Sequence, residues 1–532
     1  MRLGAPRFVL VATLAGLVAC AEGTAHDSST TELSTGTEDT GAEAPTGDGD
    51  GDPATTTTTS TTTAGEGDLP PEQELVEVGH PREFRGVWVT TVWNINWPSG
   101  QGLDQAAAQA ELLDIIEVCE AINLNAIVFQ IRPESDAVYA SELEPWSRFL
   151  TGSQGGDPGF DPLAFLIEEA HARNLEVHGW INPYRAAASA AAPLAAPHIA
   201  LEEPSHAHTY NGALWMDPGA IGVREHVVDV VVDVVERYAI DGIHLDDYFY
   251  PYPTAQPFPD DLTWNAYLAD GGSLALEDWR RDNVNALVEE LHDAVYLSDP
   301  DVRFGISPFG IYRPGIPPGI VGFDQYDQLF ADPLHWFDEG LVDYLAPQLY
   351  WPTTYAEQDY EVLLDWWTQQ SERYIFAGNY LSQLDTAPEW TLDELLLQVE
   401  LSRLYSDQNS LGNIFFQVAP LLADTLGVNG ALYDEFYAQP ALTPPLYERL
   451  DVAVEPPLVT VEGNLATVED LAGQRVRAWV VYADQGGAWQ LDHIVPASSE
   501  GVDALELGTG RWAISAAAWH NVESPGVVVE VP

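Results

Sequence analysis

The sequence contains no lysine. All 20 basic residues are arginines, against 83 acidic residues, and the formal net charge is −63. A surface this acidic repels phosphate groups, which excludes nucleic-acid binding. It also disfavours contact between the folded protein and an anionic membrane surface.

Cysteine is nearly absent, with only Cys20 and Cys119 in 532 residues. Two cysteines this far apart do not indicate a disulfide framework. Cys119 falls on the apolar stripe of a predicted helix over residues 110–122, where we interpret it as a small buried hydrophobic side chain.

No apolar run is long enough to make a good membrane span. The N-terminal stretch MRLGAPRFVLVATLAGLVAC has two arginines and then an apolar segment of signal-peptide length. It ends in Leu-Val-Ala-Cys, which resembles a bacterial lipobox, although a chance cysteine in an ordinary signal peptide would look the same. We expect residues 1–20 to be a lipoprotein signal peptide, Cys20 to be lipidated, and this anchor to be the protein's only membrane contact. Ala21 after the cysteine resembles outer-membrane sorting, so the expected location is the bacterial cell envelope, facing the periplasm or the surface.

Residues 21–80 consist mainly of Thr, Ser, Gly and acidic residues and include the run TTTTTSTTT. Such a segment buries too little apolar surface to order itself. We interpret it as a disordered acidic linker.

Short apolar segments then alternate with amphipathic helical patterns over residues 81–440. The predicted strands are residues 85–92, 125–134, 176–185, 241–249, 303–311, 342–351, 374–380 and 413–420. Eight strands joined by helical crossovers predict an α/β fold, a (β/α)8 TIM barrel. An open doubly wound sheet would need a Gly-rich phosphate turn after an early strand, and the sequence has none.

Helical periodicity stops after Pro440. Residues 450–532 show short alternating strands and turns, which predicts an accessory β-sandwich of immunoglobulin or fibronectin III type.

The segment DGIHLDDYFYPYP, residues 241–253, carries the most informative chemistry. A predicted strand ends on Asp246 and Asp247, and aromatic rings follow at once. Active sites of TIM barrels lie at the C-terminal ends of the strands. Polar or aromatic residues share one strand parity near several of these ends, which predicts a polar cleft lined with rings.

Carboxylates beside aromatic rings suit a carbohydrate substrate, because sugar faces stack on aromatic rings and glycosidic cleavage uses two carboxyl groups. We predict Asp246 as the carboxylate, with Arg132 nearby to favour its ionised form. Glu134 is the predicted acid, and Asp136 and Asp247 compete for these roles. Two structural alternatives remain open: Asp247 could cap the next turn, and Glu134 could simply pair with Arg132.

The predicted catalytic residues are Asp246, Glu134 and Asp247, and the predicted substrate-binding residues are Arg132, Asp136, His178, Asn182, Tyr184, His244, Tyr248, Gln348, Tyr350, Trp351 and Trp93.

Several blocks resemble one family in order along the chain. They are EFRGVWVTTVWNINWPS, VFQIRPESDAVYASELEPWSRFLTG, DPGFDPLAFLIEEAHARNLEVHGWINPYR, DGIHLDDYFYPYP, DWRRDNVN, FGISPFGIYR and DYLAPQLYW. Together they are similar to the glycosyl hydrolase-like family 10 domain over residues 83–420. The resemblance implies a TIM-barrel glycosidase, with peptidoglycan glycan strands as the leading substrate. GIHLDD also resembles the fourth-strand motif of amylase-like barrels, in which the matching aspartate, here Asp246, is the nucleophile. The fifth strand lacks the glutamate that supplies the acid in those families, so the acid must come from elsewhere.

We therefore expect an O-glycosidic bond hydrolase that needs no cofactor or metal. A catalytically inactive glycan-binding barrel is one alternative. A metal-dependent deacetylase or amidase acting on cell-wall glycan is another, suggested by His206 and His208 in an H-x-H pattern.

Overall fold

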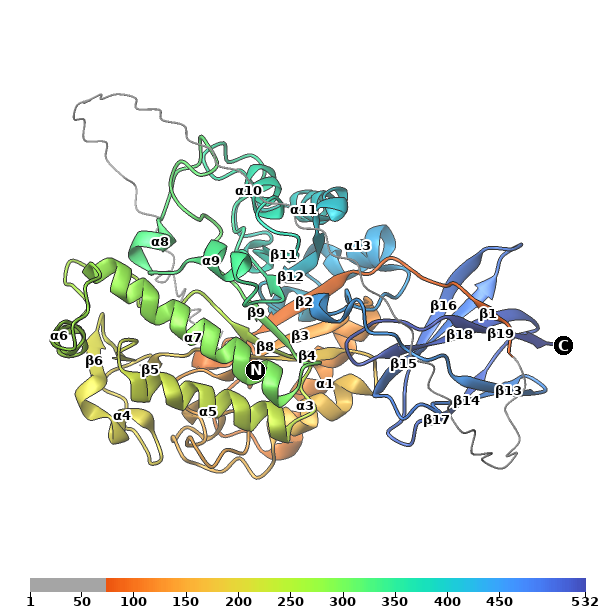
Figure 1. Cartoon of the computed structure of the whole chain (residues 1–532), viewed down its shortest axis with the longest axis horizontal. Helices are drawn as coiled ribbons and strands as arrows, with labels where there is room; N and C mark the ends of the chain where they lie inside the picture. The colour runs from red at the N-terminus through yellow and green to blue at the C-terminus, as the bar shows by residue number, and fades with distance from the viewer. Residues whose placement is uncertain (1–72) are drawn as a thin grey trace, which may run out of the picture. The chain divides into compact units, whose positions relative to one another are not determined.

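The computed structural model describes residues 73–532. It contains a closed barrel of eight parallel strands, followed by two antiparallel sheets (Figure 1). The predicted signal peptide, Cys20 and most of the predicted linker lie outside the described residues. Within the described part, no helix is long and apolar enough to cross a bilayer.

All eight predicted barrel strands are confirmed, and their order around the barrel is β10-β11-β12-β2-β3-β4-β8-β9. The bounds are β2 Phe84–Val89, β3 Ala126–Arg132, β4 Glu176–Ile181, β8 Gly242–Leu245, β9 Arg303–Ile306, β10 Tyr344–Leu345, β11 Tyr374–Asn379 and β12 Ser410–Phe415. Several strands end earlier than predicted. In β10 the ladder stops before Pro347, which has no N–H to donate. The remaining residues of these segments are loops at the barrel mouth.

Helices follow the strands and surround the barrel (Figure 1). The main ones are α1 Gln105–Ala121, α3 Pro162–His171, α5 Ile221–Arg237, α7 Leu276–Ser298, α10 Tyr360–Thr368 and α11 Leu392–Leu404. Each buries an apolar stripe on the strands, such as the valines of α5. Cys119 of α1 is a free, buried cysteine, as predicted.

Aromatic residues make up most of the apolar cluster inside the barrel. The interior cluster is Phe84, Trp88, Ala126, Val128, Trp180, Tyr344, Ala346, Tyr374, Phe376 and Ile414. Fully buried His178 and His244 contact the same rings. The predicted polar and aromatic strand parity is therefore confirmed, and it gives the barrel a hydrogen-bonding interior.

The C-terminal region has a five-stranded sheet, β1-β19-β18-β15-β16, and a three-stranded sheet, β13-β14-β17. The bounds are β1 Leu75–Val76, β13 Leu458–Glu462, β14 Leu465–Glu469, β15 Val476–Asp484, β16 Trp489–Pro496, β17 Val502–Glu506, β18 Gly510–Ala518 and β19 Gly526–Val531. Residues of both sheets share one apolar cluster, consistent with the predicted sandwich.

The predicted linker extends too far toward the barrel. Leu75 and Val76 pair with β19, and Val76 and Val78 pack on the apolar cluster around Tyr482. These apolar residues give the end of the segment a surface to bury, which the Thr/Ser-rich part lacks. The chain thus enters its described part as a strand of the C-terminal region.

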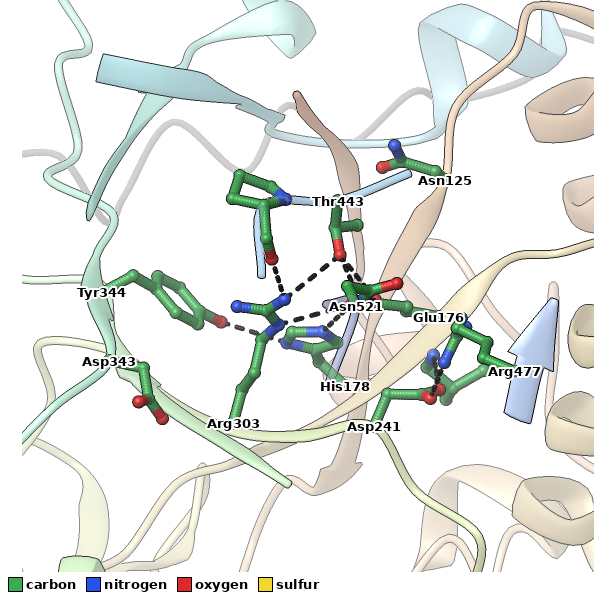
Figure 2. Close-up of polar contacts among 12 residues, drawn as sticks. Asn125, Glu176, His178, Asp241, Arg303, Asp343, Tyr344, Thr443, Arg477 and Asn521 are labelled. Carbon is green, nitrogen blue, oxygen red and sulfur yellow. Dashed lines mark hydrogen bonds and ion pairs between the residues drawn. The ribbon is translucent and has the colours of Figure 1, made fainter. Parts of the chain in front are cut away.

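A buried polar network joins the N-terminal end of the barrel to this C-terminal region (Figure 2). Glu176, at the start of β4, accepts hydrogen bonds from Thr443 at 2.6 Å and from Asn521 at 2.8 Å. Arg303 lies 3.7 Å from the other oxygen of the Glu176 carboxylate. Arg477 of β15 forms an ion pair with Asp241, just before β8. Every charge here has a partner, as a structural contact requires.

A small extra sheet, β5-β7-β6, follows β4. Its strands are β5 Arg185–Ala187, β6 Ala207–Tyr210 and β7 Ala213–Met216. This sheet brings Arg185 to the C-terminal end of the barrel, next to Asn182.

Candidate active site

Asp246 directly follows β8, and the neighbouring strand β4 orients its carboxylate. Oδ2 accepts hydrogen bonds from Trp180 Nε1 at 3.1 Å and from Asn182 Nδ2 at 2.6 Å. Oδ1 accepts a hydrogen bond from the backbone N–H of Tyr248 at 3.1 Å. The side chain that binds the next turn is thus that of Asp246, not that of Asp247. Three N–H donors fix the carboxylate in one orientation.

Asp247 also faces inward but has different partners. Oδ2 accepts a 2.5 Å hydrogen bond from the phenol of Tyr252, and Oδ1 accepts a 3.2 Å hydrogen bond from Gln348 Nε2. Asp247 is only 2% exposed and Asp246 only 6%. Among residues 73–532, neither carboxyl forms an ion pair within 4.0 Å.

This arrangement separates the protonation of the two carboxyls. Burial raises the pKa of both. For Asp247, the neighbouring charge of Asp246 adds to burial, and its pKa rises to about 7. For Asp246, the positive charge of Arg185 and three N–H donors oppose the effect of burial on the pKa. Burial and the neighbouring charge therefore act together to favour the protonated form of Asp247, whereas at Asp246 a positive charge and N–H donors act against burial.

A chain of amide hydrogen bonds fixes Asn182 in the orientation that Asp246 needs. Gln130 Nε2 donates to Asn182 Oδ1 at 2.7 Å, so Nδ2 of Asn182 points to Asp246. Gln130 Oε1 in turn accepts the backbone N–H groups of Thr91 and Val92, both at 2.9 Å. Arg185 also donates to Asn182 Oδ1, at 2.9 Å. The order of donors and acceptors admits only one orientation of both amides.

Aromatic rings on the loops after the strands lie beside these carboxyls. Tyr248 lies 5.6 Å from Tyr252, and the Tyr350 ring stacks on Tyr380 at 4.5 Å. Trp351 packs on Phe309. Together with Asn182 and Gln348, the predicted substrate-binding residues Tyr248, Tyr350 and Trp351 occupy the end of the barrel that carries Asp246 and Asp247. Trp93 follows β2 on the same end and is 50% exposed.

The expected pairing of Arg132 with Asp246 is wrong. Arg132 is fully buried and forms a bidentate ion pair with Glu144, with its shortest contact at 2.5 Å. Its remaining donors bind the backbone oxygens of Asn182 and Pro183. Glu144 gives Arg132 a buried counter-charge, so the guanidinium turns away from Asp246. Arg185 supplies the nearby positive charge instead.

Glu134 and Asp136 lie in a separate buried group at the end of β3. Glu134 forms a 2.8 Å ion pair with Arg148 and accepts the backbone N–H of Ala188. It therefore does not pair with Arg132. Asp136 accepts a 3.0 Å hydrogen bond from Gln154, and burial raises its pKa to about 7. Within the described residues, no hydrogen bond or ion pair joins either carboxyl to Asp246 or Asp247.

His178 and His244 lie beneath the site, inside the barrel, and not on its surface. Trp88 Nε1 can only donate, so His244 accepts at Nε2, 3.2 Å away, and its Nδ1–H donates to Tyr344 at 3.0 Å. Tyr344 then donates to His178 Nδ1 at 3.2 Å, and His178 Nε2–H donates to Glu176 at 3.1 Å (Figure 2). Burial holds the pKa of His244 well below its usual range. Both histidines are 0% exposed, so they do not form the part of a substrate-binding surface that the sequence predicted for them.

Tyr184 is also fully buried, in the apolar core around the barrel. Sequence reasoning missed Trp180, Gln130, Arg185 and Tyr252 as parts of the site. Strand parity places Trp180 on the face of Asn182, and this signal could have identified it. Arg185 and Tyr252 come from loops whose paths no periodicity reveals.

The H-x-H pair does not assemble a metal centre. His206 lies 3.4 Å from Glu203, and His208 lies 3.8 Å from Asp217. Across residues 73–532, no group of three or more His, Cys, Asp or Glu side chains is arranged to hold a metal ion.

Comparison with known proteins places the barrel region in a family of glycosyl hydrolase-like domains. The family model described as Glycosyl hydrolase-like 10 matches residues 83–384. The chain is 38% identical over 422 residues to Glycosyl hydrolase YngK of Bacillus subtilis (strain 168), covering 76% of this chain and 82% of the relative. It is 31% identical over 354 residues to Glycosyl hydrolase DigH of Escherichia coli (strain K12), covering 60% and 80%.

Solved structures show a more distant likeness. The glycoside hydrolase domain of PgaB (BpsB) from Bordetella bronchiseptica has a TM-score of 0.46 and 12% identity, covering 68% of this chain and all of that one. Alpha-L-fucosidase isoenzyme 2 from Paenibacillus thiaminolyticus has a TM-score of 0.44 and 15% identity, covering 67% and 49%. The family match over the barrel and the identity to relatives named as glycosyl hydrolases agree with two buried carboxyls at the barrel mouth. The chain belongs to the glycosyl hydrolase-like 10 family and is a glycoside hydrolase.

Proposed function

We propose that this enzyme cleaves O-glycosidic bonds of a polysaccharide with Asp246 and Asp247 as its two carboxyl groups. The observation that carries the proposal is their unequal setting. Asp246 has three N–H donors and a nearby arginine, whereas Asp247 has a pKa of about 7 because it is buried beside Asp246. Glycosidic cleavage needs one ionised and one protonated carboxyl, and the settings of this pair favour the protonated form at Asp247 and oppose it at Asp246.

In the proposed reaction, Asp247 donates its proton to the glycosidic oxygen as the bond to the anomeric carbon breaks. The leaving sugar departs with a new hydroxyl group. Ionised Asp246 stabilises the positive charge that develops at the anomeric carbon, and Trp180 and Asn182 hold it in place. A water molecule then supplies the hydroxyl of the second product, and its other proton restores Asp247.

Asp247 replaces Glu134 as the acid in this proposal. Glu134 is paired with Arg148 and is 1% exposed. Burial raises the pKa of Glu134 and the positive charge of Arg148 opposes that rise, but no hydrogen bond or ion pair among the described residues joins Glu134 to Asp246. Asp247 has no such cation.

We further propose peptidoglycan glycan strands as the substrate, with the enzyme tethered to the envelope through lipidated Cys20, facing the periplasm or the surface from the outer membrane. The support is the lipobox-like N-terminus, the ring-lined barrel mouth and the family resemblance. A Cys20→Ala variant should move from the membrane fraction to the soluble fraction of the envelope. Equal membrane association of both proteins would contradict the anchor.

The decisive experiment compares the wild type with Asp246→Asn and Asp247→Asn. On glycan strands, followed by mass spectrometry, both variants should lose turnover. On an aryl glycoside with a strongly acidic leaving group, Asp247→Asn should retain most activity, because departure of that group needs no proton. Asp246→Asn should remain inactive on both substrates.

Equal loss by Asp247→Asn on both substrates would contradict the acid assignment. Turnover by Asp246→Asn on glycan strands would contradict the mechanism as a whole. Binding of strands without cleavage by the wild type would instead indicate a glycan-binding barrel or a different polysaccharide substrate.

A further inference from the structure

Trp93 combines exposure with an unfavourable backbone. The loop after β2 carries two tryptophans. Trp97 is fully buried, and its Nε1 donates to the backbone oxygen of Ala108 at 3.0 Å. Trp93, in contrast, leaves half of its surface exposed, and its ring packs at a tilt against Phe149, with the ring centroids 5.9 Å apart. Trp97 therefore anchors the loop, and Trp93 is not required for its core.

The backbone at Trp93 and Asn94 lies in the left-handed region, with φ of 58° and 54°. A bulky residue with positive φ is an outlier, and such conformations persist where surrounding structure enforces them. Glycine or asparagine would occupy position 93 more cheaply. The indole therefore has a use that the fold alone does not explain.

The loop is held rigidly in this conformation. Asn94 Nδ2 donates to the backbone oxygens of Pro98 at 3.0 Å and Phe149 at 2.8 Å. Gln130 Oε1 binds the N–H groups of the two residues just before Trp93. The same Gln130 orients Asn182 against Asp246. One buried relay thus positions both the exposed indole and the catalytic carboxylate.

Strand order places these two groups across the barrel mouth. Trp93 follows β2 and Asp246 follows β8, which are three strands apart in a closed ring of eight. Neighbouring strands are about 4.8 Å apart, so three steps around the ring span well over half of the mouth. A sugar ring on the indole and the sugar attacked beside Asp246 are then different residues of one chain.

We propose that Trp93 is a stacking platform for a sugar that lies across the mouth from the cleaved bond. The substrate is then a glycan chain that spans the mouth, not a single sugar on a leaving group. This inference deepens the proposed function and rests on it. Sugar C–H faces pack on indole, and a rigid platform costs little entropy on binding.

The test uses Trp93→Ala and Trp93→Phe, with Tyr296→Ala as the control. Tyr296, near the end of α7, is also 50% exposed. Each protein is assayed on peptidoglycan glycan strands and on an aryl glycoside of one N-acetylhexosamine. Equilibrium binding of the strands is measured separately, with every variant also carrying Asp246→Asn.

Trp93→Ala should lower kcat/KM on strands at least about tenfold and weaken strand binding to a similar extent. It should leave kcat/KM on the aryl glycoside within about twofold, and Trp93→Phe should recover most of the loss. Should the alanine variant fold poorly, Trp93→Gly relieves the left-handed backbone while still removing the ring.

Unchanged strand kinetics and binding in Trp93→Ala would overturn the platform, as would an equal loss on both substrates. Absence of turnover in the wild type would count against the proposed function alone. Strand binding that falls in Trp93→Ala but not in Tyr296→Ala would still support the platform.

Discussion

Glu176 and Asp241 at the N-terminal end of the barrel and Asp247 at the C-terminal end are all buried, but their pKa values shift in opposite directions. At the N-terminal end, burial alone would raise the pKa of Glu176, yet the charges of Arg477 and Arg303 and a hydrogen bond to His178 lower it to about 2. Arg477 and His171 likewise hold the pKa of Asp241 well below its usual range. At the C-terminal end, Asp247 has no paired cation, and its pKa rises to about 7.

Burial is nearly equal in these places, so the partner decides the outcome. A carboxyl that a guanidinium neutralises contributes to structure. A carboxyl left without one can exchange a proton near neutral pH and can do chemistry. The division follows the partner and not the end of the barrel: Asp343, before β10, is buried with a raised pKa, and Glu144, beside Arg132, has a lowered one. The Asp246 and Asp247 pair lies at the C-terminal face, where reactions of TIM barrels occur.

Asp246→Asn is expected to give the largest effect, a loss of turnover that far exceeds its effect on stability. Loss of the ionised carboxylate should lower turnover of glycan strands by at least about 10³-fold. The folded state should lose less stability than in Asp241→Asn, because Asp246 forms no ion pair, although the new NH2 group cannot accept the N–H groups that bind the carboxylate. Turnover and urea unfolding of the same preparation check both points. A large fall in stability would remove the distinction between the two ends.

Asp241→Asn should lower stability and leave turnover nearly unchanged. It breaks the buried ion pair with Arg477, which keeps only the nearby charge of Glu176, and the free energy of unfolding should fall by about 3 kcal/mol. Turnover per folded molecule should stay within about twofold. Asp299→Asn is the matched control, since it breaks the more exposed ion pair with Arg475, at 2.6 Å, and should cost less than about 1 kcal/mol. Equal costs in the two variants would show that burial of the pair is irrelevant.

Lowering the pH should reduce the stability that the buried carboxyl of Glu176 contributes at the N-terminal end of the barrel. The pKa of Glu176 is depressed in the folded state, so its contribution to stability is present above the unfolded value of 4.5 and disappears as pH falls toward about 2. Unfolding free energies measured from pH 6 to pH 3 should therefore decline. Glu176→Gln should decline less steeply over the same range. Parallel slopes in the two proteins would contradict the assignment.

The smallest expected effect is on the pH profile. Asp247 acts while protonated, so turnover of glycan strands should fall as pH rises through about 7. Tyr252→Phe removes a hydrogen bond that favours the charged form, and should move this limb upward by about one pH unit. Phe309→Leu, which alters a nearby ring but no contact of Asp247, should leave the limb in place. A downward shift in Tyr252→Phe would argue against Asp247 as the acid.

Much of the fold could be predicted because it depends on local patterns. Short apolar segments between amphipathic helical patterns marked all eight barrel strands, and strand parity placed His244 and Asp246 on one face. The same parity did not reveal depth along the strand. His244 lies one pleat below Asp246 and is covered by Trp88, which is why it contacts tryptophan and not substrate.

Charge partners were the least predictable part of the site. Arg132 and Arg185 are both arginines near strand ends, and nothing local distinguishes them. Arg132 turns to Glu144 because the loop after β3 folds back over it, and Arg185 reaches Asn182 because β5 pairs with β7. The paths of these loops decide which arginine lies near Asp246, and so which positive charge acts on its pKa.

The pairing of β1 with β19 has a consequence for how the chain folds. The strand that begins the described part completes a sheet whose other members all come after residue 475. The barrel is therefore an insertion between neighbouring strands of one sheet. During synthesis, β1 must wait for the whole barrel before its partner exists, and contacts this distant in sequence form late. Loss of β19 would remove the only strand that pairs with β1 in this sheet, so the start of the described chain would lose its place in the sheet as well.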